Sequence, residues 1–446
     1  MSPGKPPSNV PLRGLRPRER MGALADTGSV VSLDAPRASP WLARFGIAVQ
    51  EDDGVATAAL SIGGARVLAA AQDERFVGGS LGARHAQALE GLFRRAVDER
   101  PAAVVLLMAS GGVRLFEANA AELAAARALR ALLDARAAGI RVAALCVGDV
   151  FGGASVMACA AGTVAMLPSA RLGLSGPRLI EASRGIAELD AADPAAVDAL
   201  FGARARAAAG DVVLVDDACA AIRDWVTTVL LDATPFDAQV GAMQAQCARS
   251  RTAEVPHARP ALLEGRRDAA AADASGRVWR VGDALVTAPF GERAFDGASV
   301  HALDASLLAA TSSVSWRAIV VTEDSPGHEV SRAAEERCDS RLLAHHAAVL
   351  ALLRHRGFPV TGLLCGRGHS AAFFVNALQA SRLVATADSR VVAMEPAAIA
   401  RVTGRDVAAL IDDDPLLGQP VRHLAALGGV QEVVDADAAL DAVLRQ

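Results

Sequence analysis

The chain contains two runs of the same design, AVVLLMASGG at residues 103–112 and VAALCVGDVFGGA at residues 142–154. Each apolar run predicts a buried strand, and the glycine pair after it predicts the opening of a helix. Glycine lets a backbone approach a ligand closely, and the first N–H groups of a helix have no acceptor inside that helix. Two such ends aimed at one point would stabilise a developing oxyanion without a charged side chain. The pattern therefore favours acyl-thioester chemistry through an enolate, with donors near Gly111, Gly112, Gly152 and Gly153.

Composition narrows the class of protein. A chain of 446 residues is long enough for two domains with full cores, and its net charge of −5 gives no reason to expect nucleic acid. Lys5 is the only lysine, and tyrosine is absent. Because Lys5 lies in a Pro- and Ser-rich terminus predicted to be disordered, the folded part has no lysine for a Schiff base, a biotin attachment or a phosphate loop. The absence of tyrosine removes a further common proton donor.

The cysteines and the apolar segments predict a cytoplasmic protein. The six cysteines form no CxxC pair, so we expect them to be reduced thiols in the core. The amino terminus shows no secretory signal. Residues 142–166 are nearly uncharged, but Asp149 and several glycines interrupt them, which favours a buried strand, turn and helix over a membrane span.

The order of the predicted elements repeats along the chain, which predicts an α/β protein with two tandem domains built from ββα units. In the first half we expect strands at 55–62, 65–71, 103–108 and 142–147, with helices at 83–98, 118–138 and from Gly152. In the second half we expect strands at 316–321, 359–364, 382–385 and 391–394, a helix at 333–354 and a turn into a helix at 366–372. The predicted boundaries are a disordered tail (1–14), a first domain (15–245), a linker (246–276) and a second domain (277–446).

Several motifs of the first half are similar to those of acyl-CoA carboxyltransferases of the crotonase superfamily. They comprise Gln72, Asp73, Phe76, the glycine turn at 78–82 and His85. Within that superfamily, SGGVRLFEAN at 110–119 and LGLSGP at 172–177 with Glu181 resemble the beta subunit of malonate decarboxylase.

The second half resembles the gamma subunit of the same enzyme. The matching residues are DSPG at 324–327, Ser331-Arg332, Glu335-Glu336, Gly366-Arg367, Ser370 and PAA at 396–398 with ARVT at 400–403. The chain therefore looks like a biotin-independent malonate decarboxylase in which the beta and gamma subunits are fused.

This resemblance implies a fold, a reaction and partners. The fold would be two ClpP/crotonase-like superhelical domains. The substrate would be a malonyl thioester on the phosphopantetheine-type, CoA-derived arm of an acyl carrier protein, with no covalently bound cofactor. Loss of CO₂ would leave an enolate, and protonation of its carbon would give the acetyl thioester. The expected partners are the acyl carrier protein subunit and an acyltransferase alpha subunit, and a homo-oligomer is a further expectation.

The candidate site residues combine the glycine pairs with neighbouring polar groups. As catalytic residues we predict Gly111, Gly112, Gly152, Gly153, Ser175, His85 and Glu181. As substrate-binding residues we predict Gly78, Gly79, Ser110, Arg114, Glu117, Gly176 and Pro177. The proton donor stays open between His85, Ser175, Glu117, Glu181 and an ordered water. Structural alternatives exist for each: tight packing for the glycines, a hydrogen-bonded core histidine for His85, and ion pairs with Arg114 or Arg178 for the two glutamates.

No metal site is expected. His345, His346 and His355 lie on a predicted helix without clustered acids, and Asp412-Asp413-Asp414 predicts a solvated loop. Asn119 is interpreted as a helix cap.

Departures from the family pattern leave two other functions open. Ala109 stands where the beta subunits carry Asp, and His369, Ala371 and Ala372 replace a glycine-richer turn. Since alanine restricts φ and narrows the approach to the backbone, the second half is expected to be mainly structural. The alternatives are a biotin-dependent acyl-CoA carboxyltransferase and a non-catalytic scaffold that binds carrier protein.

Overall fold

The computed structural model describes residues 11–35, 37–248, 258–312, 314–394, 399–400 and 414–445. Its contacts divide the chain into two compact units. Unit 1 comprises Met1–Arg114, Arg127–Gln239 and Val330–Arg341; unit 2 comprises Leu115–Ala126, Val240–Glu329 and Leu342–Gln446. Each unit thus contains one short segment from the opposite half of the sequence, an exchange that the predicted boundaries do not include.

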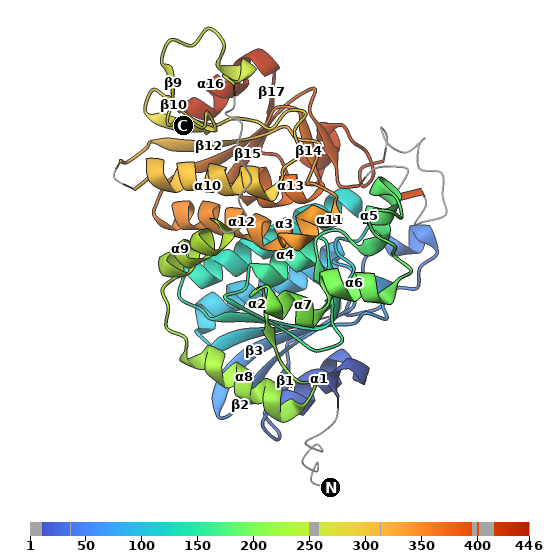
Figure 1. The fold of residues 1–446 in the computed structure, drawn as a ribbon. Helices are drawn as coiled ribbons and strands as arrows, with labels where there is room; N and C mark the ends of the chain where they lie inside the picture. Colours follow the sequence, from blue (N-terminus) through green and yellow to red (C-terminus); the bar gives the residue numbers. More distant parts are fainter. Residues whose placement is uncertain are drawn as a thin grey trace. The chain divides into compact units, whose positions relative to one another are not determined.

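Unit 1 is built on an eight-stranded sheet, seen in blue and cyan in Figure 1. Its first three strands are antiparallel, and β3, β4, β5, β6 and β8 then follow one another in parallel. The strands are β1 (Val31–Ser32), β2 (Val55–Ile62), β3 (Ala65–Gln72), β4 (Ala103–Ser110), β5 (Val142–Phe151), β6 (Thr163–Met166) and β8 (Val213–Leu214), with β7 (Leu172–Gly173) pairing with the end of β5. Every residue of β4 is buried, as its unbroken apolar run predicted.

Helices surround this sheet. Apolar residues of α1 and α8 form one core with alternate residues of β2, β3, β4 and β5, because successive side chains of a strand point to opposite faces. The helices of unit 1 are α1 (Pro17–Leu24), α2 (Ala83–Glu99), α4 (Gly153–Cys159), α5 (Pro177–Arg184), α6 (Pro194–Phe201), α7 (Ala203–Ala208), α8 (Cys219–Leu231) and α11 (Arg332–Glu336). Three further helices cross the division between the units: α3 (Ala118–Ala137), α9 (Phe236–Cys247) and α12 (Asp339–His355).

Unit 2 repeats the same topology in seven strands. Three antiparallel strands are again followed by parallel ones: β9 (Ala269–Ala271), β10 (Val278–Val281), β11 (Ala284–Thr287), β12 (Ala318–Glu323), β13 (Val360–Leu364), β15 (Arg382–Thr386) and β17 (Glu432–Val434). A separate pair joins β14 (Arg367–His369) to β16 (Arg390–Val392). The helices are α10 (Gly297–Ala310), α13 (Ser370–Val375), α15 (Val421–Ala426) and α16 (Ala439–Leu444). The internal repeat predicted from the sequence is therefore confirmed.

Several predicted element boundaries were wrong. Strand β5 continues through Gly148 to Phe151, because its end pairs with both β4 and β7. The helix predicted at 333–354 is two helices, α11 and α12, separated at Cys338, whose φ is +56°. Leu12, predicted to lie in the disordered tail, is buried in a short 3-10 helix, and its N–H donates to Asp217 Oδ1 at 2.6 Å.

The predictions for the carboxyl-terminal loops had mixed outcomes. Asp414 is buried and accepts hydrogen bonds from the N–H groups of Leu416 and Leu417, so it is not the solvated residue predicted. Asp412 and Asp413, and the matching motif at 396–398 and 401–403, lie outside the described residues. Within the predicted linker, residues 261–263 form a 3-10 helix and β9 is an edge strand.

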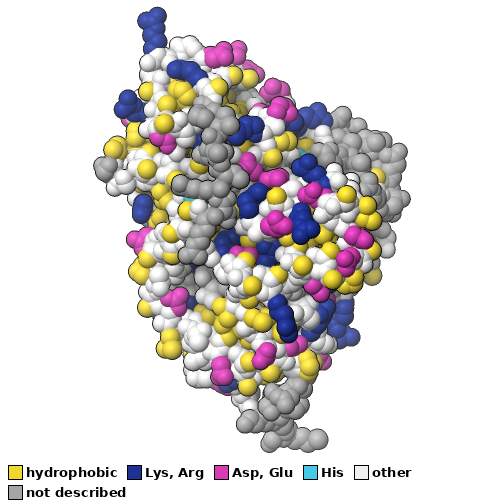
Figure 2. Space-filling model, in the orientation of Figure 1, with side chains coloured by type: hydrophobic (Ala, Val, Ile, Leu, Met, Phe, Trp, Pro, Cys, Tyr) yellow, Lys and Arg dark blue, Asp and Glu magenta, His cyan; other side chains and the backbone are white. Residues whose placement is uncertain are grey.

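The surface carries charges of both signs. On the face seen in Figure 2, arginine side chains alternate with aspartate and glutamate side chains among the described residues. This mixture agrees with the small net charge of −5. None of the described helices combines the length and apolar character needed to cross a bilayer.

Candidate active site

The loops that follow β4 and β5 meet at the carboxyl ends of these strands in unit 1. Gly112 has φ +104°, and a Cβ placed on it would lie 3.2 Å from Phe151 O and 3.3 Å from Gly152 Cα. Gly152 has φ +59°, and its own Cβ would lie 3.3 Å from Gly112 Cα. Both positions therefore require glycine, for backbone conformation and for space. The two glycine loops are therefore in backbone contact at Gly112 and Gly152.

The four predicted N–H donors divide into two kinds. Gly111 N–H donates to Gly78 O at 2.9 Å, and Gly152 N–H donates to Leu174 O at 3.0 Å, so both hold the loops together. Gly112 N–H makes a long contact with Ser110 Oγ at 3.3 Å. Gly153 is the first residue of α4, and its N–H donates to no acceptor within the described part of the chain. The N–H groups of Gly111 and Gly152 are thus used in loop contacts, whereas those of Gly112 and Gly153 are bound weakly or not at all.

The glycine turn before α2 supports the β4 loop. Gly79 has φ +66°, and a Cβ on it would lie only 2.0 Å from Ala109 O, so no other residue fits this position. Gly78 (φ +63°) is exposed, and its carbonyl is the acceptor for Gly111. The backbones of Gly78 and Gly79 therefore help to position the loop after β4.

His85 is enclosed in the core beneath this turn. Its side chain is fully buried, and its Nε2 lies 3.1 Å from Gln72 Nε2. Since the Gln72 amide can only donate through that nitrogen, Nε2 of His85 is the acceptor, and Nδ1–H donates to Asp53 O at 3.2 Å. Burial, reinforced by the charge of Arg114, lowers the pKa of His85 to about 3. His85 is therefore a neutral residue at pH 7 that fixes Gln72, whose Oε1 in turn accepts from Ala109 N–H at 3.1 Å.

The guanidinium of Arg114 also makes buried contacts inside unit 1. Its Nη1 forms an ion pair with Asp53 Oδ1 at 2.7 Å, and both side chains are fully buried. The same guanidinium donates to Ser80 Oγ and Ser80 O and lies 5.3 Å from the centre of the Phe76 ring. Sequence reasoning predicted contact with substrate, whereas this environment makes Arg114 a residue that holds the 80–82 turn against the β4 loop. Sequence reasoning named Gln72 only as a motif residue and missed Asp53, both of which belong to the same network.

The remaining predicted site residues lie in the loop after β7 and in α5. Ser175 is fully buried, and its backbone N–H donates to Glu335 Oε1 at 2.6 Å. Gly176 and Pro177 open α5 as its N-cap and first residue. Glu181 Oε2 accepts from Ala191 N–H at 3.0 Å, which ties α5 to the segment after it.

Glu117 and Asn119 belong to unit 2. Glu117 is fully buried, so it is not the solvated residue considered from the sequence. Asn119 Nδ2 donates to Gly418 O at 2.8 Å, and its backbone N–H donates to Leu416 O at 3.0 Å. Asn119 therefore fixes the 416–418 loop and is not a simple helix cap.

The equivalent loops of unit 2 are filled by a side chain. Phe295 N–H donates to Gly327 O at 2.8 Å, just as Leu81 N–H donates to Gly112 O at 2.8 Å in unit 1. A Cβ on Gly327 would lie 3.2 Å from the imidazole Cγ of His369, which caps α13 where glycine caps α4. The imidazole thus takes the space that glycine leaves open in unit 1.

The histidines of α12 belong to a buried polar cluster of unit 2. His346 Nδ1 lies 2.6 Å from Asp304 Oδ1, which places α12 beside α10 (Figure 1). Burial alone would lower the pKa of His346, but the Asp304 carboxylate raises it. The acid beside His346 is a single aspartate from another helix, which the sequence of α12 alone does not indicate. Among the described residues no group of three His, Cys, Asp or Glu side chains is placed to hold a metal ion.

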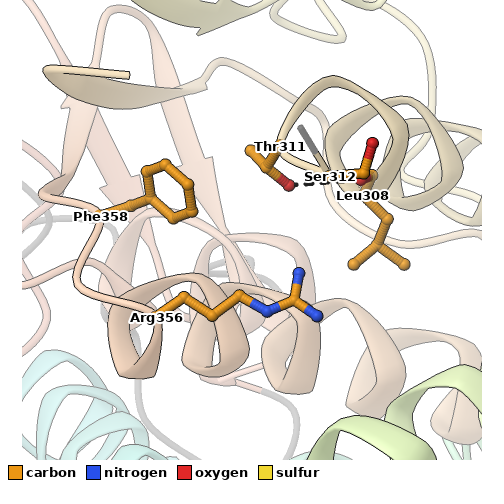
Figure 3. A pocket seen from close by; sticks show the side chains of 5 residues that line it. All are labelled: Leu308, Thr311, Ser312, Arg356 and Phe358. Atoms are coloured by element: carbon orange, nitrogen blue, oxygen red, sulfur yellow. Dashed lines mark hydrogen bonds between the residues drawn. The ribbon is translucent and has the colours of Figure 1, made fainter. Parts of the chain in front are cut away.

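A separate hollow of about 460 Å³ lies in unit 2. Leu308, Thr311 and Ser312 at the end of α10 line it together with Arg356 and Phe358, which precede β13 (Figure 3). It therefore lies toward the amino end of β13, opposite the edge that carries the Gly327 loop, and we do not assign it to the candidate site.

The fold and these loops define a carboxyl transferase. The family described as carboxyl transferase domain matches residues 14–249, slightly more than half of the chain, so the chain belongs to this family. Residues 297–446 match the family described as malonate decarboxylase gamma subunit. The chain thus joins the two, which confirms the predicted resemblance to fused malonate decarboxylase subunits, and the tandem crotonase-like fold is confirmed with it.

Three similar proteins each match between about a third and just over a half of the chain. The malonyl-S-ACP:biotin-protein carboxyltransferase of Malonomonas rubra is 33% identical over 233 residues, which are 48% of this chain and 73% of that protein. The acetyl-coenzyme A carboxylase carboxyl transferase subunits beta/alpha of Parafrankia sp. (strain EAN1pec) are 33% identical over 177 residues, 36% of this chain and 29% of that protein. A chain of the Pseudomonas malonate decarboxylase hetero-tetramer, solved in complex with malonate, is 33% identical with a TM-score of 0.51, and the match covers 56% of this chain and 95% of that one.

Proposed function

We propose that the chain decarboxylates a malonyl thioester carried by an acyl carrier protein, giving the acetyl thioester and CO₂. Membership of the carboxyl transferase family and the gamma-subunit domain support this reaction class. The observation that carries the proposal is the contact between the Gly112 and Gly152 loops, whose positive φ angles and close spacing favour glycine.

In the proposed reaction the bond between the malonyl α-carbon and its carboxylate breaks. The electron pair moves onto the thioester as an enolate, and CO₂ leaves. N–H groups of Gly112 and Gly153 would then donate to the enolate oxygen. One such preorganised donor is typically worth about 3 kcal/mol, or roughly 10²–10³ in rate.

A proton must then reach the α-carbon. His85 is a poor donor because it is enclosed and neutral, and Glu181 is already bonded to Ala191 N–H. We therefore retain Ser175, Glu117 and a water molecule as candidates, and Ser175 adjoins the residue that accepts from Gly152.

We further propose that the thioester arrives on a phosphopantetheine-type arm of a separate carrier protein. The relative in Malonomonas rubra is described as acting on malonyl-S-ACP, and the Pseudomonas relative as a hetero-tetramer. An acyltransferase alpha subunit would supply the carrier with malonyl groups.

The test is release of CO₂ from malonyl-CoA and from malonyl-carrier protein by the purified full chain, without biotin or ATP. We expect turnover of both substrates. A folded protein that releases no CO₂ from either would refute the proposal.

One observation favours a second function. The Malonomonas rubra relative is described as a biotin-protein carboxyltransferase, so the chain is also a candidate for moving the carboxyl group to biotin. Adding a biotinylated carrier discriminates the two, because transfer requires it and direct decarboxylation does not. Under either function we expect the acyl group to bind at the same glycine loops.

A further inference from the structure

The segment Val330–Arg341 comes from the second half of the sequence but packs within unit 1. Ser340 Oγ lies 2.7 Å from Ser155 Oγ on α4, and Arg206 Nη1 donates to Glu335 O at 2.6 Å. These contacts tie α11 to α7 and the start of α12 to α4. The segment therefore brings a side chain of the gamma-like half to the glycine loops of the carboxyl transferase half.

That side chain is Glu335, which is buried with only 1% of its surface exposed. Its Oε1 accepts from Ser175 N–H at 2.6 Å, and its Oε2 accepts from Leu174 N–H at 3.0 Å. The fit is close, since a Cβ on Gly173 would lie 2.8 Å from Oε2. One carboxylate thus holds two successive N–H groups of the loop after β7, an arrangement stronger than two neutral hydrogen bonds.

The held loop in turn holds the candidate oxyanion site. Leu174, whose N–H is bound by Glu335, accepts the N–H of Gly152 through its carbonyl at 3.0 Å. Gly152 is the N-cap of α4 and precedes Gly153, the proposed donor. Only two hydrogen bonds, through one peptide residue, separate Glu335 from the start of α4.

We propose that Glu335 is a positioning residue for the decarboxylation, which it supports by fixing the Leu174–Ser175 loop and through it the Gly152–Gly153 end of the oxyanion site. The inference rests on the proposed function for its kinetic consequences. It gives the gamma-like half a defined part in a site whose other residues lie in the first half, without direct contact to substrate.

The charge state of Glu335 gives a second readout. Burial raises the pKa of Glu335 to about 7, although the Ser175 N–H, Arg206 and the Leu174 N–H each favour the ionised form. Arg206 approaches from α7 with Nη2 at 3.5 Å, Asp339 at the start of α12 opposes ionisation, and Asp211 faces Arg206. Since only the carboxylate accepts both N–H groups at full strength, positioning should weaken as the pH falls below about 7.

The experiment compares Glu335→Gln with Glu336→Gln in the full-length chain. Glu336 is the matched control, because it is the next residue, is 55% exposed and pairs with the exposed Arg332 at 2.8 Å. In E335Q the amide NH₂ must oppose one of the two N–H groups. We expect kcat for malonyl-CoA to fall by about 100-fold with KM within threefold, because a small displacement of a reacting group costs that much. E336Q should match the wild type.

Two measurements complete the test. The acid limb of the kcat profile near pH 7 should be present in the wild type and absent in E335Q. Amide hydrogen exchange at residues 152, 174 and 175 should be faster in E335Q than in E336Q. In the wild type, protection of these three amides should be lower at pH 5.5 than at pH 8, a comparison that needs no folded variant.

The outcomes separate this inference from the proposed function. An inactive wild type with the expected exchange pattern overturns the proposed function and retains the positioning of the loop. An active wild type with E335Q equal to E336Q in kcat and exchange overturns the role of Glu335. Equal protection at both pH values in the wild type also counts against it.

Discussion

Replacing Gly112 by alanine is the sharpest perturbation of the candidate oxyanion site. At φ +104° an L-residue is strained, which costs about 1–2 kcal/mol. The new methyl group would also meet Phe151 O at 3.2 Å and Gly152 Cα at 3.3 Å. Both neighbours are backbone atoms, so the two loops must separate by a few tenths of an ångström, which overpacking studies place at about 1–3 kcal/mol. We expect the free energy of unfolding to fall by roughly 2–5 kcal/mol in total.

The effect on catalysis should exceed the effect on stability. Separating the loops moves Gly112 N–H and the start of α4 away from the proposed position of the enolate oxygen. Losing one oxyanion donor costs roughly 10²–10³ in kcat. The assay is CO₂ release from malonyl-CoA at saturating substrate, with urea unfolding followed in parallel.

Gly210→Ala is the matched control. Gly210 also has a positive φ, +77°, but no atom lies within 4 Å of its Cβ position. The unfolding free energy of G210A should therefore fall only by the backbone strain of about 1–2 kcal/mol, and its kcat should equal that of the wild type. A folded G112A protein whose kcat is within threefold of the wild type would refute the assignment of this loop to the oxyanion site.

Three further predictions concern groups beneath the site. The pKa of His85 is near 6.5 in the unfolded chain and about 3 in the folded chain, so the free energy of unfolding should fall by about 1.4 kcal/mol per pH unit as the pH drops through this window. In urea melts at several pH values, the free energy of unfolding of His85→Gln should depend less on pH than that of the wild type. Asp53→Asn leaves Arg114 buried without its counter-charge and should cost about 3–5 kcal/mol in unfolding free energy, whereas a change under 1 kcal/mol would contradict the ion pair. Burial raises the pKa of Cys146 to about 12, so iodoacetamide should label it only after denaturation, as read by peptide mass spectrometry; rapid labelling of native protein would contradict this.

The exchange of segments between the units bears on how fused subunits cooperate. Because Glu335 is covalently part of the second half yet binds the 174–175 loop of the first, the fusion keeps this contact at a fixed stoichiometry. A separately expressed first half would lack the carboxylate and should show faster amide exchange at Leu174 and Ser175 than the full chain.

The sequence alone determined the repeat and its strands, because the runs at 103–108 and 142–147 are continuously apolar and are followed by glycine. The sequence also indicated the glycine pairs, because glycine commonly stands where a loop must come close to another backbone. Only the tertiary structure decided which N–H groups hold the loops together. Gly111 and Gly152 look equivalent to Gly112 and Gly153 in the sequence, but their acceptors, Gly78 O and Leu174 O, come from loops more than twenty residues away. The same holds for Asp304 beside His346 and for Glu335 beneath Ser175. Such partners are set by how distant segments pack, and a local pattern of residue types carries no record of that packing.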